Sequence, residues 1–151
     1  MIRVVPLQRV LSRLFLAGTI VLGLAACTGG ATDTSNLAGP GYGCLDDSKG
    51  CIDQRQAALK SLLADKSHAW VRHPASAESY AAGVRLYAFK TRKRELSCED
   101  LAHGRREAEG AGPVLRGAAG RLSPAQISRG AMFATEVSRE LAGEMGRRCR
   151  A

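Results

Sequence analysis

Cysteine is the residue type in this chain with the widest choice of chemistry, because a thiol can be acylated, oxidised to a disulfide or bound to a metal ion. Zinc sites usually present closely spaced Cys or His ligands, and the chain contains no Cys-x-x-Cys pair. His68 and His73 are five residues apart, but they flank Trp70 and run into Pro74. We therefore expect disulfides or covalent modification, with no metal and no cofactor. The cysteines concerned are Cys27, Cys44, Cys51, Cys98 and Cys149.

Acid–base catalysis needs a positioned carboxyl, imidazole or amine, and the adjacent carboxyls of Glu99 and Asp100 are the nearest match. Acidic residues are also common in the first turn of a helix, where they complement the helix dipole. Neither a glycine-rich phosphate loop nor a Gly-x-Ser-x-Gly motif occurs. A further charged cluster indicates a solvated helix face: Arg105, Arg106, Glu107 and Glu109. We therefore predict no catalytic residue.

The first 26 residues have the layout of a secretory signal peptide. Arg3, Arg9 and Arg13 form a positively charged start without an acidic residue. The 13 residues Leu14–Ala26 carry no charge, and this run is shorter than the roughly 20 residues of a transmembrane helix. It suits the apolar region of a signal peptide. An ordinary secretory signal, with Cys27 merely near the cleavage point, is one interpretation.

The four residues Leu24-Ala25-Ala26-Cys27 resemble the lipobox of bacterial lipoproteins. In that family the thiol takes a diacylglycerol, a peptidase cuts before the cysteine, and the new amine is usually acylated. The resemblance implies that Cys27 is lipid-modified, and two or more acyl chains anchor a protein stably where one chain binds only marginally. In the Gram-negative sorting rule that this resembles, Asp after the cysteine retains the protein in the inner membrane. Thr28 stands there, which favours the outer membrane and leaves the inner membrane open.

Residues 27–43 are rich in Gly, Thr and Ser, and such a stretch buries too little surface to order itself. We expect a flexible tether there, followed by a periplasmic domain at 44–151. Removal of 26 residues leaves 125 of 151, enough for one small domain. Removal of three arginines lowers the formal net charge from +8 to +5. That charge suits anionic lipid, lipopolysaccharide or cell-wall polymer, and we expect no nucleic-acid partner.

The densest basic run is Lys90-Thr91-Arg92-Lys93-Arg94. Cations at the end of a helix complement the helix dipole, and this explains the run without any ligand. In the other interpretation, Lys90, Arg92, Lys93 and Arg94 contact an anionic surface. Both interpretations stay open.

Two helices are predicted in the first half of the domain. Apolar residues recur at helical spacing over residues 51–66. A second helix is expected from Ser76, as N-cap, to about Thr91. Residues 84–89 also fit a β-strand, but their alanine-rich flanks favour helix. The single tryptophan, Trp70, is expected to fill the core.

Two more helices are predicted in the second half. One begins after Ser97 and should end near Gly110, before a glycine-rich loop that reaches Leu122. The other begins at Ser123 and Pro124, an N-cap followed by proline at the first helical position. Its apolar stripe runs nearly to residue 149. The pattern predicts an all-α fold, a small irregular bundle of about four helices.

If Cys27 is lipidated, four cysteines remain, and an even number suits two disulfides in an oxidising compartment. Three connectivities are open. An antiparallel arrangement of the last two helices would bring Cys98 to Cys149. Cys44 and Cys51 would then close a short loop, and we favour this connectivity.

Beyond the lipobox, three segments are similar to those of uncharacterised small lipoproteins of Gram-negative bacteria: residues 51–56, 94–98 and 122–126. The resemblance implies no activity and no site residues. We expect a lipid-anchored outer-membrane lipoprotein whose periplasmic helical domain binds an envelope partner, either a protein or an anionic polymer. The alternative is a small envelope enzyme that acts on the cell wall with Glu99 or Asp100.

Overall fold

The computed structural model of this chain describes residues 42–149. The predicted signal peptide, Cys27 and the tether as far as residue 41 lie outside the described residues, so they stay predictions. Within the described residues there are five α-helices, one 3₁₀ helix and no strand. They are α1 (Lys49–Ala64), η1 (Ala69–Arg72), α2 (Ala77–Ala82), α3 (Val84–Arg92), α4 (Cys98–Gly117) and α5 (Pro124–Arg148). The all-α fold is confirmed, and residues 84–89 are helical.

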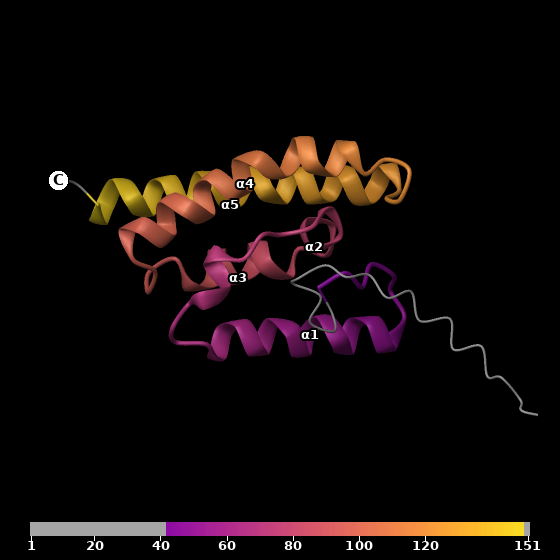
Figure 1. The fold of residues 1–151 in the computed structure, drawn as a ribbon, viewed down its shortest axis with the longest axis horizontal. Helices are drawn as coiled ribbons and strands as arrows, with labels where there is room; N and C mark the ends of the chain where they lie inside the picture. The colour runs from indigo at the N-terminus through magenta and orange to yellow at the C-terminus, as the bar shows by residue number, and fades with distance from the viewer. Residues whose placement is uncertain (1–41, 150–151) are drawn as a thin grey trace, which may run out of the picture. The chain divides into compact units, whose positions relative to one another are not determined.

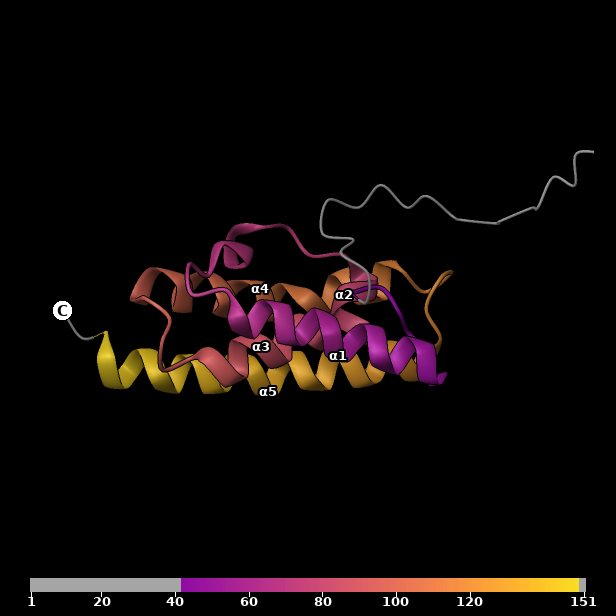
Figure 2. The same cartoon turned by 90° about the horizontal axis from the view of Figure 1, so that it is seen from below.

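The two longest helices, α4 and α5, form an antiparallel pair (Figure 1). Helices α2 and α3 pack against this pair, and α1 lies on the other side of α2 and α3 (Figures 1 and 2). The core forms between these layers, and its fully buried side chains include Leu86, Phe89, Leu96, Leu101, Leu115, Val137 and Leu141. Trp70 is buried and meets Phe89 edge to face, with ring centroids 4.7 Å apart. No described helix combines the length and the apolar character needed to cross a membrane.

Serine side chains begin four of the five α-helices. Ser48, Ser76, Ser97 and Ser123 each accept a hydrogen bond from the backbone N–H three residues further on. Such bonds satisfy one of the backbone donors that a helix start leaves unpaired. At Ser123 the bond is reciprocated, because the Gln126 side chain accepts from the Ser123 N–H at 2.8 Å. The predicted caps at 76, 97 and 123 are confirmed, while Ser48 starts α1 two residues earlier than expected.

The predicted helix over residues 76–91 is wrong in one respect, because the chain breaks it into α2 and α3. Gly83 separates the two with φ of 74°. Its N–H donates to the carbonyl oxygens of Ser79 and Tyr80, which closes α2. Residues other than glycine rarely adopt this left-handed conformation. The break turns α3 so that both Val84 and Phe89 reach the core.

The predicted helix end near Gly110 is also wrong, since α4 continues through Pro113 to Gly117. Proline inside a helix removes one backbone hydrogen bond and costs about 3 kcal/mol. The last turns of α4 bury Ala111 and Leu115 completely against the bundle. Burying a leucine side chain stabilises by roughly 1.5–3 kcal/mol, so the burial of Leu115 offsets much of the local penalty.

Gly104 allows α3 and α4 to approach closely, which leads to a stability prediction. A Cβ built at Gly104 would lie 2.4 Å from Cε1 of Phe89, a ring that is fully buried. We expect Gly104→Ala to lower the free energy of unfolding by about 1–3 kcal/mol, the usual cost of overpacking. Urea denaturation of the variant and the parent protein measures this change.

Gly110 in the same helix is the matched control, because nothing lies within 4 Å of a Cβ built there. Gly110→Ala should raise the free energy of unfolding by roughly 0.5–1 kcal/mol, the helix-propensity gain. A stabilising effect of both substitutions would contradict the close approach of Phe89 to α4.

Candidate functional site

A groove of about 480 Å³ lies between α1 and α5, over the junction of α2 and α3. Its floor is the turn Ala81–Val84, and its apolar walls include Ile52, Leu59, Tyr87 and Phe133. Tyr87 is a large aromatic residue that is nevertheless 48% exposed. Gly83 is part of the floor, so the helix break described above also shapes the groove.

Two arginines border the groove in different electrostatic situations. Arg55 is bound by the segment before α1, as described below. Arg129 lies on the exposed face of α5 and has no hydrogen bond or ion pair within the described residues. Arg129 is therefore the cation of the groove with free binding capacity.

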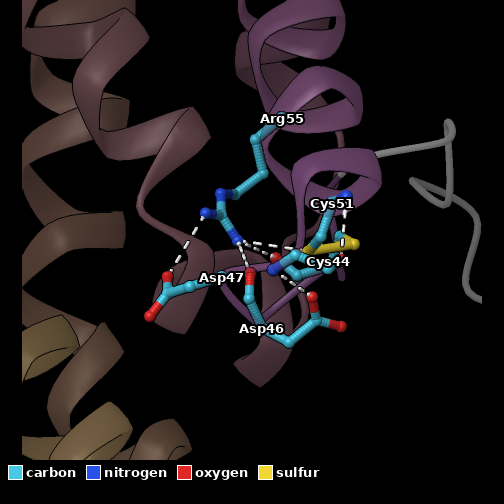
Figure 3. The surroundings of a disulfide bond; sticks show 6 residues. Cys44, Asp46, Asp47, Cys51 and Arg55 are labelled. Carbon is cyan, nitrogen blue, oxygen red and sulfur yellow. Dashed lines mark hydrogen bonds and ion pairs between the residues drawn. A yellow bond between two sulfur atoms is a disulfide. The ribbon is translucent and has the colours of Figure 1, made fainter.

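The Cys44–Cys51 disulfide closes a short loop before α1 (Figure 3). Leu45 and Asp47 of this loop line the groove. Nη1 of Arg55 donates to the carbonyl oxygens of Cys44 and Asp46, at 3.1 and 2.7 Å. The same nitrogen lies 3.2 Å from Sγ of Cys51, and Nη2 lies 3.7 Å from the Asp47 carboxylate. Arg55 and the disulfide together hold the loop against α1, so this wall is preorganised.

The Cys44–Cys51 loop also raises the question of a metal site. Ligand atoms of Cys44, Asp46 and Cys51 lie within 4.8 Å of one another. The two sulfur atoms are bonded to each other, however, and zinc requires free thiolates. The Arg55 guanidinium beside Cys51 already places a positive charge at this position. We assign the cluster to the disulfide.

The second disulfide joins Cys98, at the start of α4, to Cys149, directly after α5. Their Cα atoms are 5.7 Å apart, within the range of ordinary disulfides. The antiparallel α4–α5 pair brings the two ends together. Both disulfides thus have the connectivity that the sequence favoured.

The basic run at the end of α3 is mostly neutralised inside the domain. Lys90 bonds Glu136 and lies 3.2 Å from Glu140, and Lys93 also bonds Glu140. These bonds place the pKa of Glu140 below its ordinary value of 4.5, chiefly through the hydrogen bond from Lys93. In addition, Arg92 pairs with Glu95 at 2.5 Å, and Arg94 is exposed. The run therefore ties α3 to α5 more than it presents charge to solvent.

The buried pair of Arg85 and Glu107 was missed from the sequence. Arg85 is 1% exposed, and its Nε and Nη2 donate to the two oxygens of Glu107 at 2.5 and 2.6 Å. Nη1 donates to the carbonyl oxygen of Trp70, and Nη2 is also within hydrogen-bond distance of the carbonyl oxygens of Val71 and His73. The prediction that Glu107 lies on a solvated face is therefore wrong, because its side chain is 7% exposed.

The available sequence signal for this pair was indirect. Arg85 stands within an otherwise apolar run, and Glu107 lies one turn from residues that face the core at 104 and 111. The negative charge of Glu107 also affects the pKa of Tyr80. Burial of Tyr80 is the larger cause and the charge of Glu107 the smaller one, and together they raise the pKa of Tyr80 to about 12.

Glu99 and Asp100, which the enzyme alternative would use as its acid, lie in the first turn of α4 and interact with its N-cap and with Arg72. Asp100 Oδ2 accepts from the Ser97 hydroxyl at 2.7 Å, and the Asp100 N–H donates back to that hydroxyl at 3.1 Å. Arg72 lies 3.5 Å from Asp100 and 3.7 Å from Glu99. Both carboxylates are thus explained by helix capping and ion pairing.

The fold and the groove together define a class: a small all-α domain closed by two disulfides, with one preorganised apolar groove. No model of a protein family matches the chain, and neither the curated proteins nor the solved structures give a significant match. The function must therefore be inferred from the residues of the chain itself.

Proposed function

We propose that the protein is a lipid-anchored lipoprotein of the outer membrane whose periplasmic helical domain binds a partner protein of the envelope at the groove. The lipobox-like Leu24-Ala25-Ala26-Cys27 and the Thr at position 28 support the anchor and its membrane. The observation that supports binding is the exposed groove, with Ile52, Tyr87 and Phe133 beside an unpaired arginine.

The composition of the groove favours a protein over an anionic polymer. Aromatic residues and arginine are enriched where proteins bind each other, and charged residues other than arginine are depleted at the centre of such interfaces. A polymer of anionic units would need several free cations along its path. Only Arg129 offers one within this groove, because Arg55 is already bound to the disulfide loop. The partner segment is expected to carry apolar side chains and one acidic group that pairs with Arg129.

The enzyme alternative receives less support. An envelope hydrolase would use a carboxyl whose pKa is raised by burial. Among the described residues, the carboxyl pKa values that shift are all lowered, mainly by hydrogen bonds or ion pairs: Asp46, Asp65, Glu78, Glu95, Glu140 and Glu144.

The anchor is tested by growth with a labelled fatty-acid analogue. The parent protein should incorporate the label, and Cys27→Ser should abolish it, because the thiol is the acyl acceptor in the lipoproteins that this segment resembles. Thr28→Asp should keep the label but move the protein to the inner-membrane fraction of a density gradient. Equal labelling of the parent protein and Cys27→Ser would refute lipidation at this residue.

The groove is tested by photo-crosslinking in intact cells. A benzophenone amino acid at Tyr87, on the groove, should give a discrete adduct with one partner protein. The same group at Val114, which is 45% exposed on α4 and outside the groove, is the matched control. Arg129→Glu should abolish the adduct at position 87 by repelling the acidic group.

Three outcomes would overturn protein binding at this groove. These are no adduct at position 87, the same adduct from position 114, and an adduct that Arg129→Glu leaves unchanged. A diffuse, protease-resistant adduct would instead assign the groove to an envelope polymer.

A further inference from the structure

A second pocket, of about 440 Å³, lies between η1 and α4 and differs from the groove in its chemistry. Its lining includes Pro74 and Ala75 and one carboxylate, that of Glu107. The side chains that can donate hydrogen bonds there are Arg72, His73, Tyr80, His103 and Arg106. This pocket is separate from the proposed partner groove, and Tyr80 is the one residue that lines both.

The single carboxylate that lines this pocket is already neutralised. Both oxygens of Glu107 accept hydrogen bonds from Arg85, which is buried behind the pocket. A buried bidentate pair of this kind has no net charge. The positive charge facing the pocket therefore comes from Arg72 and Arg106.

The two arginines of the pocket are not equally available. Arg72 is shared with Asp100 and Glu99 at 3.5 and 3.7 Å. Arg106 is exposed and has no hydrogen bond or ion pair within the described residues. Arg106 can thus direct a full guanidinium fork at a ligand.

His103 adds a second donor with unused capacity. Its Nδ1 is buried without a hydrogen bond and lies 4.0 Å from Oε2 of Glu107. Since Nδ1 is directed to Glu107, Nε2 is the ring nitrogen left for a ligand.

The position of His73 is held independently of any ligand. Nη2 of Arg85 donates to the His73 carbonyl oxygen at 2.7 Å and to that of Val71 at 2.9 Å. These bonds fix the segment that follows η1 on the side of the pocket opposite α4. A backbone segment that is held in place before binding reduces the entropy that a ligand must offset.

We propose that this pocket is an oxyanion-binding site that takes a phosphate or carboxylate group between Arg106, His103 and His73. A guanidinium matches two oxygens of such a group in one plane, and imidazole N–H groups can bind further oxygens. The group can come from free phosphate, from a phosphorylated headgroup or from a carboxylate, and all three share this chemistry.

The test is calorimetric titration of the full chain, purified in nonionic detergent, with inorganic phosphate, glycerol phosphate and acetate in turn. Saturable binding of at least one anion is expected. Arg106→Gln should weaken it roughly tenfold by removal of the charge-assisted bonds, and His103→Gln should weaken it as well. Arg105→Gln is the matched control, because Arg105 is the neighbouring residue, pairs with Glu109 and lies outside the pocket.

The anion that binds most tightly identifies the source: glycerol phosphate a headgroup, inorganic phosphate the free ion, and acetate a carboxylate. No saturable binding of any of the three would overturn the site. Affinity that is unchanged in Arg106→Gln, or equally reduced in Arg105→Gln, would also overturn it. Equal melting temperatures of the variants exclude loss of folding as the cause. Arg129→Glu should leave anion affinity unchanged, so this result is separable from the fate of the groove.

Discussion

Replacement of Glu107 by glutamine is expected to lower the free energy of unfolding by about 3–5 kcal/mol, the cost of leaving one member of a buried ion pair without its partner. Arg85 would keep its positive charge at 1% exposure, with only uncharged acceptors around it: the glutamine amide oxygen and three backbone carbonyl oxygens. Urea denaturation measures the loss.

The exposed pair of Arg105 and Glu109 supplies the control, since it lies on the same helix with a separation of 2.8 Å and side chains 44% and 47% exposed. Glu109→Gln should cost less than about 1 kcal/mol, because solvent screens the charges of an exposed pair. A similarly small loss in Glu107→Gln would contradict the importance of the buried pair.

A double-mutant cycle separates the ion pair from the backbone bonds of Arg85. Arg85→Met should destabilise as well, because it removes the donors that satisfy the carbonyl oxygens of Trp70, Val71 and His73. The double variant Arg85→Met with Glu107→Gln should lose less than the sum of the single losses. It should stay less stable than the parent, since the three carbonyl oxygens would still lack the Arg85 donors.

The second large effect is expected from the disulfide between Cys98 and Cys149. The paired variant Cys98→Ser with Cys149→Ser should lose about 4 kcal/mol, because this bond closes a sequence separation of 51 residues. Cys44→Ser with Cys51→Ser removes a bond over 7 residues and should cost about 2 kcal/mol by the same chain-entropy relation. Paired replacement leaves no free thiol that could form a new disulfide.

Urea denaturation of both paired variants and the parent protein measures the difference. A reducing agent serves as the control, because it should bring the parent protein below either variant. If the short disulfide contributed more than the long one, loop closure would not be the main origin of the stabilisation. The stabilisation by the short disulfide would then come mainly from the bonds between its loop and Arg55.

Local signals predicted the helix starts of this domain well. Ser76, Ser97 and Ser123 act through a single hydrogen bond to a backbone N–H three residues away, so the cap and its acceptor lie within one short segment. Apolar spacing in the last helix likewise indicated its buried face from residue 134 to residue 141. These features need no knowledge of the rest of the chain.

Helix ends were predicted less well, because glycine and proline give ambiguous local signals. Gly83 ends a helix, whereas Gly110 and Pro113 lie within one. The difference comes from packing: the segment after Gly110 buries Ala111 and Leu115 completely. That gain depends on α5, which is absent from any local window of sequence.

The sequence by itself therefore determined the all-α class and three of the helix caps. It also determined the pairing of the cysteines, once the last two helices were taken as antiparallel. The lipobox-like segment, on which the proposed anchor depends, is likewise a feature of the sequence alone. The tertiary structure alone decided which charged residues are buried and which surfaces are hollow. Arg85 and Glu107 are 22 residues apart and reside on different helices, so no local pattern links them. The groove and the oxyanion pocket each combine residues from at least three elements. Their chemistry depends on which side chains already have partners, and that depends on how the helices pack.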